Sequence, residues 1–171
     1  MNETIKTILA RRSCRNFTSE PVDEETVRLL LDCALAAPTG MGKQSWQFTA
    51  VTNKRKIQKL ASAVGEILQN TGYNMYKPPL IIIASNLKTS KFKHFDTACA
   101  LENIFIACQS LNLGCVWLNQ LMDIDDKPDI RKILTEFGIP EDHGVYGIAA
   151  IGHKALEAPV KKITGKSLII N

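Results

Sequence analysis

Apolar residues recur every three or four positions in three long segments of the chain, and this spacing predicts amphipathic helices. The segments cover residues 23–37, 56–70 and about 90–113. Asp23 is a suitable N-cap for the first helix, and Pro38 ends it, because proline lacks the backbone donor that a helix needs. The third segment is apolar on nearly every side, which indicates a central helix or one that packs against a second subunit.

Two shorter helices and one helix end are predicted from capping residues. Asn2 can cap a helix that leads into an arginine-rich segment. Pro128 suits the first turn of a helix over 129–137, which Gly138 would terminate. Gly114 is the expected C-cap of the long third helix, because glycine readily takes the left-handed conformation found at such ends.

Four short apolar segments between the helices predict β-strands. They cover residues 47–51, 80–85, 115–118 and 144–152. The second is rich in β-branched residues and does not alternate with polar ones, so we expect a central strand that is buried on both faces. Residues 167–170 form a further apolar segment, which needs a sheet edge in its own chain or in a partner.

The composition is that of an ordinary globular protein, with 171 residues, 45% hydrophobic and 22% charged. With no repeats or linkers, this length predicts one domain, residues 1–171. The formal net charge of +4 suits an anionic small ligand as well as a nucleic acid. The longest apolar run, 80–84, is too short to span a bilayer and no signal-peptide pattern is found, so we expect a cytoplasmic protein without membrane contact.

Cysteine and histidine spacing favours neither a metal site nor a disulfide framework. The five cysteines are odd in number and none forms a C-x-x-C pair, and the three histidines are isolated. Neither a structural metal nor a protein nucleophile is therefore expected. Cys14 lies among arginines, which can lower a thiol pKa, but the usual burial of free cysteine favours a small core residue.

The densest group of functional side chains consists of Arg11, Arg12, Ser13 and Arg15, which we call the arginine segment. The planar donor fork of arginine suits phosphate and planar carbonyl groups, and serine adds a hydroxyl. The same cluster also fits a solvated helix end, because cations are favourable at a helix C-terminus.

A polar loop at residues 38–46 is the second candidate. Its glycines and Lys43 are reminiscent of a P-loop, but alanine stands at position 37 and glutamine follows the lysine. A dinucleotide fingerprint fails as well, since Ser45 occupies the position of the third glycine. The loop either joins a helix to a strand or brings backbone donors and an amide to a planar ligand.

Another polar segment, 70–77, is predicted to be conformationally loose.

Several blocks taken together resemble the FMN-dependent nitroreductase family, in its short, single-domain form. Their order and spacing extend over nearly the whole chain, and this combination is more specific than any one block. The blocks are residues 11–17 with Pro21-Val22, 37–41 with 44–48, 96–104, 113–117 and 148–152.

The resemblance implies an α+β fold, in which a central, mostly antiparallel sheet is flanked by helices. It also implies an intertwined homodimer, in which the strand at 167–170 of each chain crosses to the partner. Two FMN sites would lie at the dimer interface. This arrangement would account for both the two-sided apolar helix and the apolar C-terminal segment.

The resemblance further assigns roles to residues at the two ends of the flavin. Arg11 and Ser13 are expected to hold the FMN phosphate. A tail lysine is expected to assist, and the sequence does not choose between Lys161 and Lys162. Arg15 is expected to face the pyrimidine edge, where a cation stabilises the negative charge that develops on reduction.

Other implied contacts come from the polar loop and from the strand that ends near residue 118. Arg12 is expected to contribute a backbone or phosphate contact, and Gln44 an amide contact to the ring. Residues 38–41 would line the cofactor from the other subunit, and the backbone at 118–120 would donate to flavin N5. The remaining implied cofactor-binding residues are therefore Pro38, Thr39, Gly40, Met41, Leu118, Asn119 and Gln120.

The implied activity is the reduction of nitroaromatics, quinones or similar small-molecule acceptors, with NADH or NADPH as a transient donor in a ping-pong scheme. The missing dinucleotide fingerprint fits, because the nicotinamide need only visit the site. One open alternative is a flavin enzyme with a different acceptor, such as a dehalogenase or enone reductase. The other is a non-catalytic module that binds nucleic acid or another anion, but no nucleic-acid-binding pattern accompanies the arginine segment.

Overall fold

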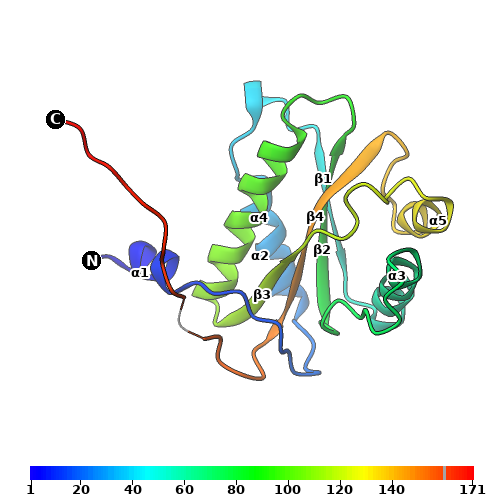
Figure 1. Cartoon of the computed structure of the whole chain (residues 1–171), viewed down its shortest axis with the longest axis horizontal. Coiled ribbons are helices and arrows are strands. Elements are labelled where there is room, and N and C mark those ends of the chain that lie inside the picture. The colour runs from blue at the N-terminus through cyan, green and yellow to red at the C-terminus, as the bar shows by residue number, and fades with distance from the viewer. Residues whose placement is uncertain (160) are drawn as a thin grey trace.

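The computed structural model describes residues 1–159 and 161–171, and four strands form one antiparallel sheet in this part of the chain. Their order across the sheet is β1-β2-β4-β3 (Figure 1). The strands are β1 (Trp46–Val51), β2 (Leu80–Leu87), β3 (Leu113–Leu118) and β4 (His143–His153). The α+β class expected from the sequence is therefore confirmed.

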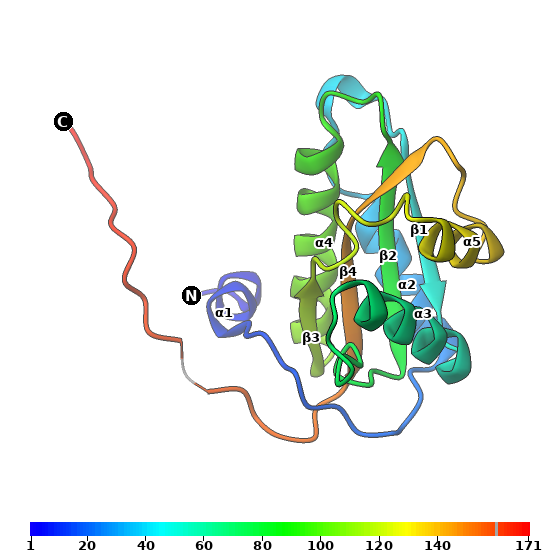
Figure 2. The ribbon, with the colours of Figure 1, turned by 45° about the vertical axis from the view of Figure 1, so that its right-hand side comes forward.

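Helices cover both faces of the sheet, as Figures 1 and 2 show. One face carries α2 (Glu24–Leu35) and α4 (Lys93–Ser110), and the other carries α3 (Lys54–Ile67) and α5 (Pro128–Glu136). The short helix α1 (Glu3–Ala10) contacts α4 from outside, and none of its residues is buried. No helix among residues 1–159 and 161–171 is long and apolar enough to cross a membrane.

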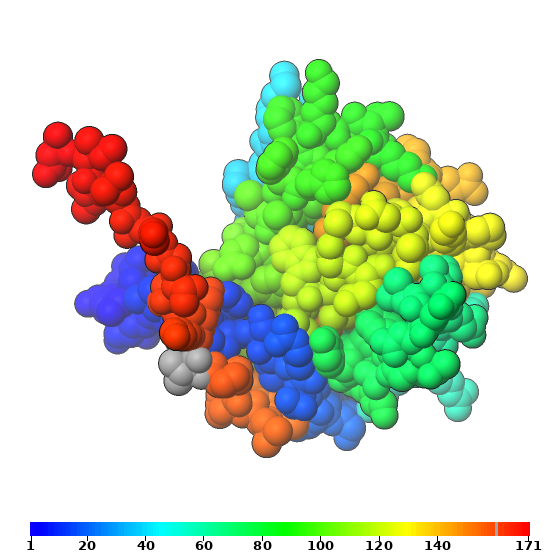
Figure 3. Space-filling model, in the orientation of Figure 1, coloured from blue at the N-terminus to red at the C-terminus, as the bar shows by residue number. Residues whose placement is uncertain are grey.

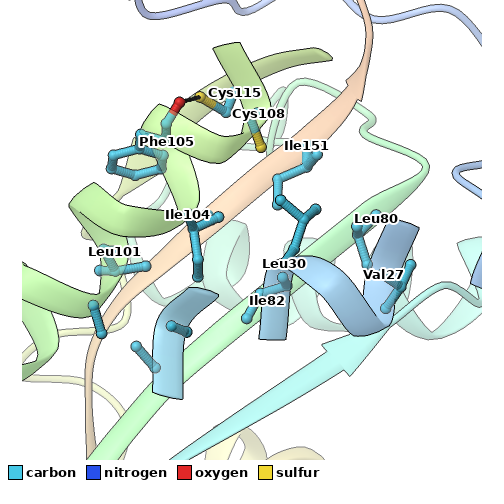
Figure 4. Packing of buried hydrophobic residues seen from close by; sticks show 14 of the residues in the cluster. Val27, Leu30, Leu80, Ile82, Leu101, Ile104, Phe105, Cys108, Cys115 and Ile151 are labelled. Carbon is cyan, nitrogen blue, oxygen red and sulfur yellow. Dashed lines mark hydrogen bonds between the residues drawn. The ribbon is translucent and has the colours of Figure 1, made fainter. Parts of the chain in front are cut away.

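The central position of β2 is confirmed, because residues 80–86 are all buried. Side chains alternate across a strand, so Leu80 and Ile82 join the α2–α4 layer while Ile81 and Ile83 join the α3–α5 layer. Figure 4 shows Leu80 and Ile82 in the first of these layers. Two separate apolar cores are thus built on one pair of central strands.

The cysteines are largely core residues, as the sequence indicated. Cys14, Cys108 and Cys115 are buried, and all five cysteines have free thiols. A hydrogen bond with Cys115 and burial raise the pKa of the Cys108 thiol, which keeps this side chain protonated. Figure 4 shows both sulfur atoms in the α4–β3 part of the core.

The predicted helix C-cap at Gly114 is wrong. The helix α4 ends at Ser110, and Asn112 takes the left-handed conformation with φ 56°. Gly114 instead lies within β3, where a Cβ atom would be 2.7 Å from the Cys14 sulfur. Close approach of another segment, and not a helix end, therefore requires glycine here.

Other helix signals are confirmed with small shifts at the ends. The Asp23 carboxylate accepts a hydrogen bond from the Thr26 amide at 2.8 Å and caps α2. The helix α3 begins two residues earlier than predicted, because Asn53 caps it. Pro128 opens α5, and Gly138 follows it with φ 78°.

Residues 161–171 extend away from the sheet as an exposed tail (Figures 1 and 2). Leu168, Ile169 and Ile170 are 82%, 86% and 85% exposed. Within the described part of this chain, the predicted strand at 167–170 does not form. Its pairing with a partner's sheet stays a prediction.

A buried Ser85–His143 pair lies at a β-bulge between β2 and β4. The Ser85 hydroxyl donates to the Gln47 carbonyl at 3.1 Å, so the neutral ring of His143 donates from Nδ1 to the Ser85 oxygen, also at 3.1 Å. Burial lowers the pKa of His143 below its ordinary value.

This pair predicts a loss of stability on acidification. Because the pKa of His143 is lower in the folded chain than in the unfolded chain, protonation favours unfolding as the pH falls through about 6.5. The loss of stability levels off at pH values below the pKa of His143 in the folded chain. Urea unfolding at pH 7.5 and 5.5 should show a smaller difference for His143→Gln than for the parent. The exposed His94→Gln control should keep the parent's difference, and an unchanged difference in His143→Gln would contradict the assignment.

Candidate functional site

The arginine segment is attached to the outer edge of β3. The Cys14 amide donates to the Cys115 carbonyl at 2.8 Å, and Ser13 forms a parallel bridge with the same residue. Cys14 is 4% exposed, whereas Ser13 and Arg15 on either side of it are exposed. Alternation along an extended segment therefore turns the candidate ligand residues outward and places the thiol in the core, as the sequence favoured.

A second attachment lies just after the arginine segment. The Thr18 amide donates to the His153 carbonyl at 2.9 Å, and Phe17 forms an antiparallel bridge with Lys154. In Figure 3 this stretch is the blue strip that crosses the lower part of the visible face. Backbone pairing on both sides of Arg15 thus fixes its position relative to the sheet.

The first two arginines have contacts within the chain. Arg11 Nε lies 3.4 Å from Glu102 Oε1 on α4. Arg12 Nη1 donates to the Leu9 and Arg11 carbonyls at 2.8 and 2.7 Å. Each contact engages one guanidinium nitrogen, and an arginine has five N–H donors, so the geometry is compatible with an additional anion.

Two tyrosines that the sequence analysis did not select lie in this region, Tyr76 beside Arg15 and Tyr73 beside Gln120. The guanidinium carbon of Arg15 lies 5.9 Å from the centre of the Tyr76 ring. The Tyr73 hydroxyl donates to Gln120 Oε1 at 3.1 Å, and the Asn119 amide donates to the same oxygen at 3.0 Å. The structure thus brings Arg15 and the end of β3 together through the segment at 70–77.

Burial raises the pKa of Tyr73 to about 12, with a further contribution from Tyr76. The Tyr73 hydroxyl is therefore a donor throughout the physiological range. Two donors, this hydroxyl and the Asn119 amide, converge on one oxygen of an exposed glutamine side chain. A planar ligand with an acceptor atom at that position could take both hydrogen bonds.

The segment 70–77 is not loose, contrary to the prediction. Met75, Tyr76 and Lys77 all take left-handed conformations, with φ 54°, 65° and 51°. The Asn74 side chain accepts from the Tyr76 amide at 2.9 Å, and Met75 is 1% exposed. Such conformations cost about 1–3 kcal/mol each and persist where the surroundings enforce them, commonly at functional sites. The sequence feature that could have drawn attention to this segment is a pair of tyrosines in a polar stretch before two prolines.

The polar loop lies at a different end of the molecule. The short helix η1 (Gly40–Gly42) belongs to it, and Figures 1 and 2 show this loop at the top, remote from the arginine segment. A hollow of about 430 Å³ adjoins it. Residues 38–44 and the arginine segment therefore do not meet within one chain. The hollow is lined by Met41, Lys43, Ser45, Leu87, Thr89, Ser90, Lys91 and Phe92.

The two tail lysines are exposed. Lys161 and Lys162 lie on the extended tail, and the described residues include no hydrogen bond or ion pair from either. Their part in phosphate binding therefore stays a prediction.

The chain belongs to the nitroreductase family, whose family model matches residues 8–153. It is similar to a solved structure of a nitroreductase with bound FMN from Bacteroides fragilis, with 34% identity and a TM-score of 0.89. That similarity covers 100% of this chain and 98% of the other.

Curated relatives include a flavin reductase and a flavin oxidoreductase. An NADPH-flavin oxidoreductase of Vibrio harveyi is 26% identical, over 94% of this chain and 70% of the relative. An FMN reductase (NADPH) of Bacillus subtilis is also 26% identical, over 91% of this chain and 67% of the relative.

The residues at the edge of β3 fit a flavin mononucleotide chemically. Arg11, Arg12 and Ser13 supply cationic and hydroxyl donors suited to a phosphate. Arg15 supplies a cation for an electron-rich ring edge. The donors that converge near residue 120 suit a ring nitrogen or carbonyl. The polar loop lies at the other end of the chain and takes no part in this donor set.

Proposed function

We propose that this chain is an NAD(P)H-dependent FMN oxidoreductase that reduces nitroaromatics, quinones or similar small acceptors. The observation that carries the proposal is the pair of contacts near the edge of β3, in a member of the nitroreductase family. Arg15 lies against the Tyr76 ring, and the Tyr73 hydroxyl donates to Gln120 Oε1. Family membership alone would leave the cofactor unassigned, and this donor set supplies the chemical reason for FMN.

The proposed enzyme is a homodimer with two cofactor sites at its interface. Each site would take the arginine segment and residues 118–120 from one subunit and residues 38–44 from the other. The separation of these parts within one chain supports this division, since they cannot serve the same ligand otherwise.

Exchange of the tail would stabilise this dimer. The sheet has two outer strands, β1 and β3, and the arginine segment already bridges to β3. The edge of β1 is therefore the proposed acceptor for residues 167–170 of the partner. Pairing there would bury apolar side chains that are otherwise exposed to water and would cover a strand edge.

The residues of this chain would bind and tune the cofactor, while bound FMN would supply the hydride chemistry. Arg11 and Ser13 would neutralise and orient the phosphate. Arg15 would stabilise negative charge at the pyrimidine edge, and its backbone attachment and the neighbouring Tyr76 ring would keep it in place. Because no dinucleotide-binding motif is present in the sequence, the nicotinamide donor and the acceptor would use the same site in turn.

The acceptor class distinguishes this proposal from a flavin enzyme of the same fold that acts as a dehalogenase or enone reductase. Acceptor choice depends on the shape of the completed site, which includes residues of both subunits. Nitroaromatics and quinones are proposed because the chain belongs to the nitroreductase family.

The first prediction from the proposed function concerns the purified protein in the absence of oxygen. It should show the absorption spectrum of bound flavin, or acquire it with added FMN, and NADH or NADPH should bleach it. Heat-denatured protein with FMN is the control. A protein that takes up no FMN would contradict the proposed function and would leave another anion as the ligand of the arginine segment.

The second prediction concerns Arg15. The variant Arg15→Ala should bind FMN at least about tenfold more weakly, because a contact with a charged group contributes about 1.5–3 kcal/mol. Flavin reduction should also be slower. Titration of the apoprotein with FMN measures the affinity. Arg28→Ala, an exposed arginine paired with Glu24 on α2, should bind as the parent does. Equal affinities for all three proteins would remove the proposed role.

The third prediction concerns the tail. A chain that ends at Lys166 should dimerise at least about a hundredfold more weakly, because burial of each large aliphatic side chain contributes about 1.5–3 kcal/mol. Sedimentation over a range of concentrations measures this change. Lys166→Ala retains the apolar residues and should dimerise normally. A truncated chain with the parent's dimer affinity would contradict tail exchange.

A further inference from the structure

The loop at residues 39–45, called the anchored loop below, keeps an irregular shape on the surface. Met41, Gly42 and Gln44 have φ values of 59°, 66° and 48°, in the left-handed region. Met41 is 80% exposed, so the shape does not arise from packing of its own side chain in a core. Left-handed backbone at non-glycine residues is unfavourable, so contacts with other parts of the chain must maintain it.

A buried carboxylate provides one such contact. Asp96 lies in the first turn of α4 and is 4% exposed. Its Oδ1 atom accepts a hydrogen bond from the Gly40 amide at 2.8 Å, across 56 positions of sequence. Burial protects this hydrogen bond from competing water.

Steric contact reinforces the same position. A Cβ atom at Gly40 would overlap the Phe92 ring, just before α4. The backbone therefore touches the start of α4 so closely that glycine alone fits. Asp96 and Phe92 together determine where residue 40 lies.

The far end of the anchored loop has a separate attachment. The Ser45 hydroxyl donates to Asn86 Oδ1 at 2.8 Å, and the Leu87 amide donates to the Ser45 carbonyl at 3.2 Å. Asn86 lies in β2 and is fully buried. Buried polar side chains thus hold the loop at both ends, and its exposed middle projects outward.

Both anchors keep one polar atom without a partner among the described residues, Asp96 Oδ2 and Asn86 Nδ2. Each unsatisfied buried group costs about 1–3 kcal/mol. Both residues thus hold the loop through one atom each, Asp96 Oδ1 at the Gly40 amide and Asn86 Oδ1 at the Ser45 hydroxyl.

We propose that Asp96 is a positioning residue for the cofactor, which preforms the anchored loop for contact with the FMN bound to the partner subunit. The inference rests on the proposed function and goes beyond it, because it assigns a determinant of affinity to a buried side chain outside the site. Preformed loops bind more tightly because less conformational freedom is lost on association.

The test compares FMN affinity in apoprotein variants by fluorescence titration. Asp96→Ala should bind FMN about tenfold more weakly, equivalent to about 1.4 kcal/mol. Asp96→Asn keeps an acceptor oxygen at Oδ1 and should stay within about threefold of the parent, in the range of a change in hydrogen-bond strength. If Asp96→Asn binds as weakly as Asp96→Ala, the charge and not the anchoring is what matters, and the proposal is overturned.

Asp125→Ala is the matched control for stability. The Asp125 carboxylate also accepts a backbone amide bond at 2.8 Å, from Val145, but on the opposite side of the sheet near α5. This variant should lose stability and keep the parent's FMN affinity. Equal loss of affinity in Asp96→Ala and Asp125→Ala would overturn the proposal in favour of a general loss of folding.

A second variant and a second readout separate the possible failures. If Asp96→Ala does not fold, Gly40→Ala displaces the loop through Phe92 and should weaken FMN binding similarly. Hydrogen exchange at the Gly40 amide needs no cofactor, and Asp96→Asn should protect this amide while Asp96→Ala should not. If the parent protein fails to bind FMN, the proposed function is contradicted. If the rate of hydrogen exchange at the Gly40 amide is the same in Asp96→Ala as in the parent, the proposed anchoring of the loop by Asp96 is contradicted.

Discussion

β2 and β4 pair in antiparallel register from Leu80 opposite Ile151 to Leu87 opposite His143, and both strands are buried on both faces. Every other element is arranged around this pair. Alternating side chains supply the α2–α4 layer and the α3–α5 layer at once, so the two apolar cores cannot shift independently. The outer strands β1 and β3 then have one neighbour each, and polar segments can attach beside them.

The candidate site uses these attachments. Backbone pairing fixes the arginine segment beside β3, and buried Asp96 and Asn86 fix the anchored loop near the start of β1. Left-handed backbone occurs both in this loop and at residues 75–77, outside the regular elements. A stable centre thus permits strained segments at the periphery, where they add little to stability.

Much of the fold could be predicted from the sequence because it depends on local signals. Asp23, Pro128 and Gly138 start or end a helix through contacts within one turn. The unbroken apolar run of β2 indicates directly that this strand is buried. The prediction for Gly114 was wrong because glycine is needed both at helix ends and where two distant segments touch. No local sequence pattern distinguishes these two roles. The neighbour of Gly114, Cys14, is a hundred positions away in sequence.

The site was less predictable for the same reason. The arginine segment could be selected by composition, but Tyr76 approaches Arg15, and Tyr73 approaches Gln120, only in the tertiary structure. The distance between the polar loop and the arginine segment within one chain could not be read from spacing either. Asp96 belongs to one of the sequence blocks, but its hydrogen bond to the Gly40 amide spans 56 positions and forms only in the folded chain.

The contact between Gly114 and Cys14 also limits how this family member can change. A side chain at position 114 would occupy the volume of the Cys14 sulfur, and a larger side chain at position 14 would press on the backbone of β3. The two positions are therefore sterically coupled. Any side chain at position 114 would meet Cβ as well as Sγ of Cys14, so it would require the arginine segment to move away from β3 together with Ser13 and Arg15.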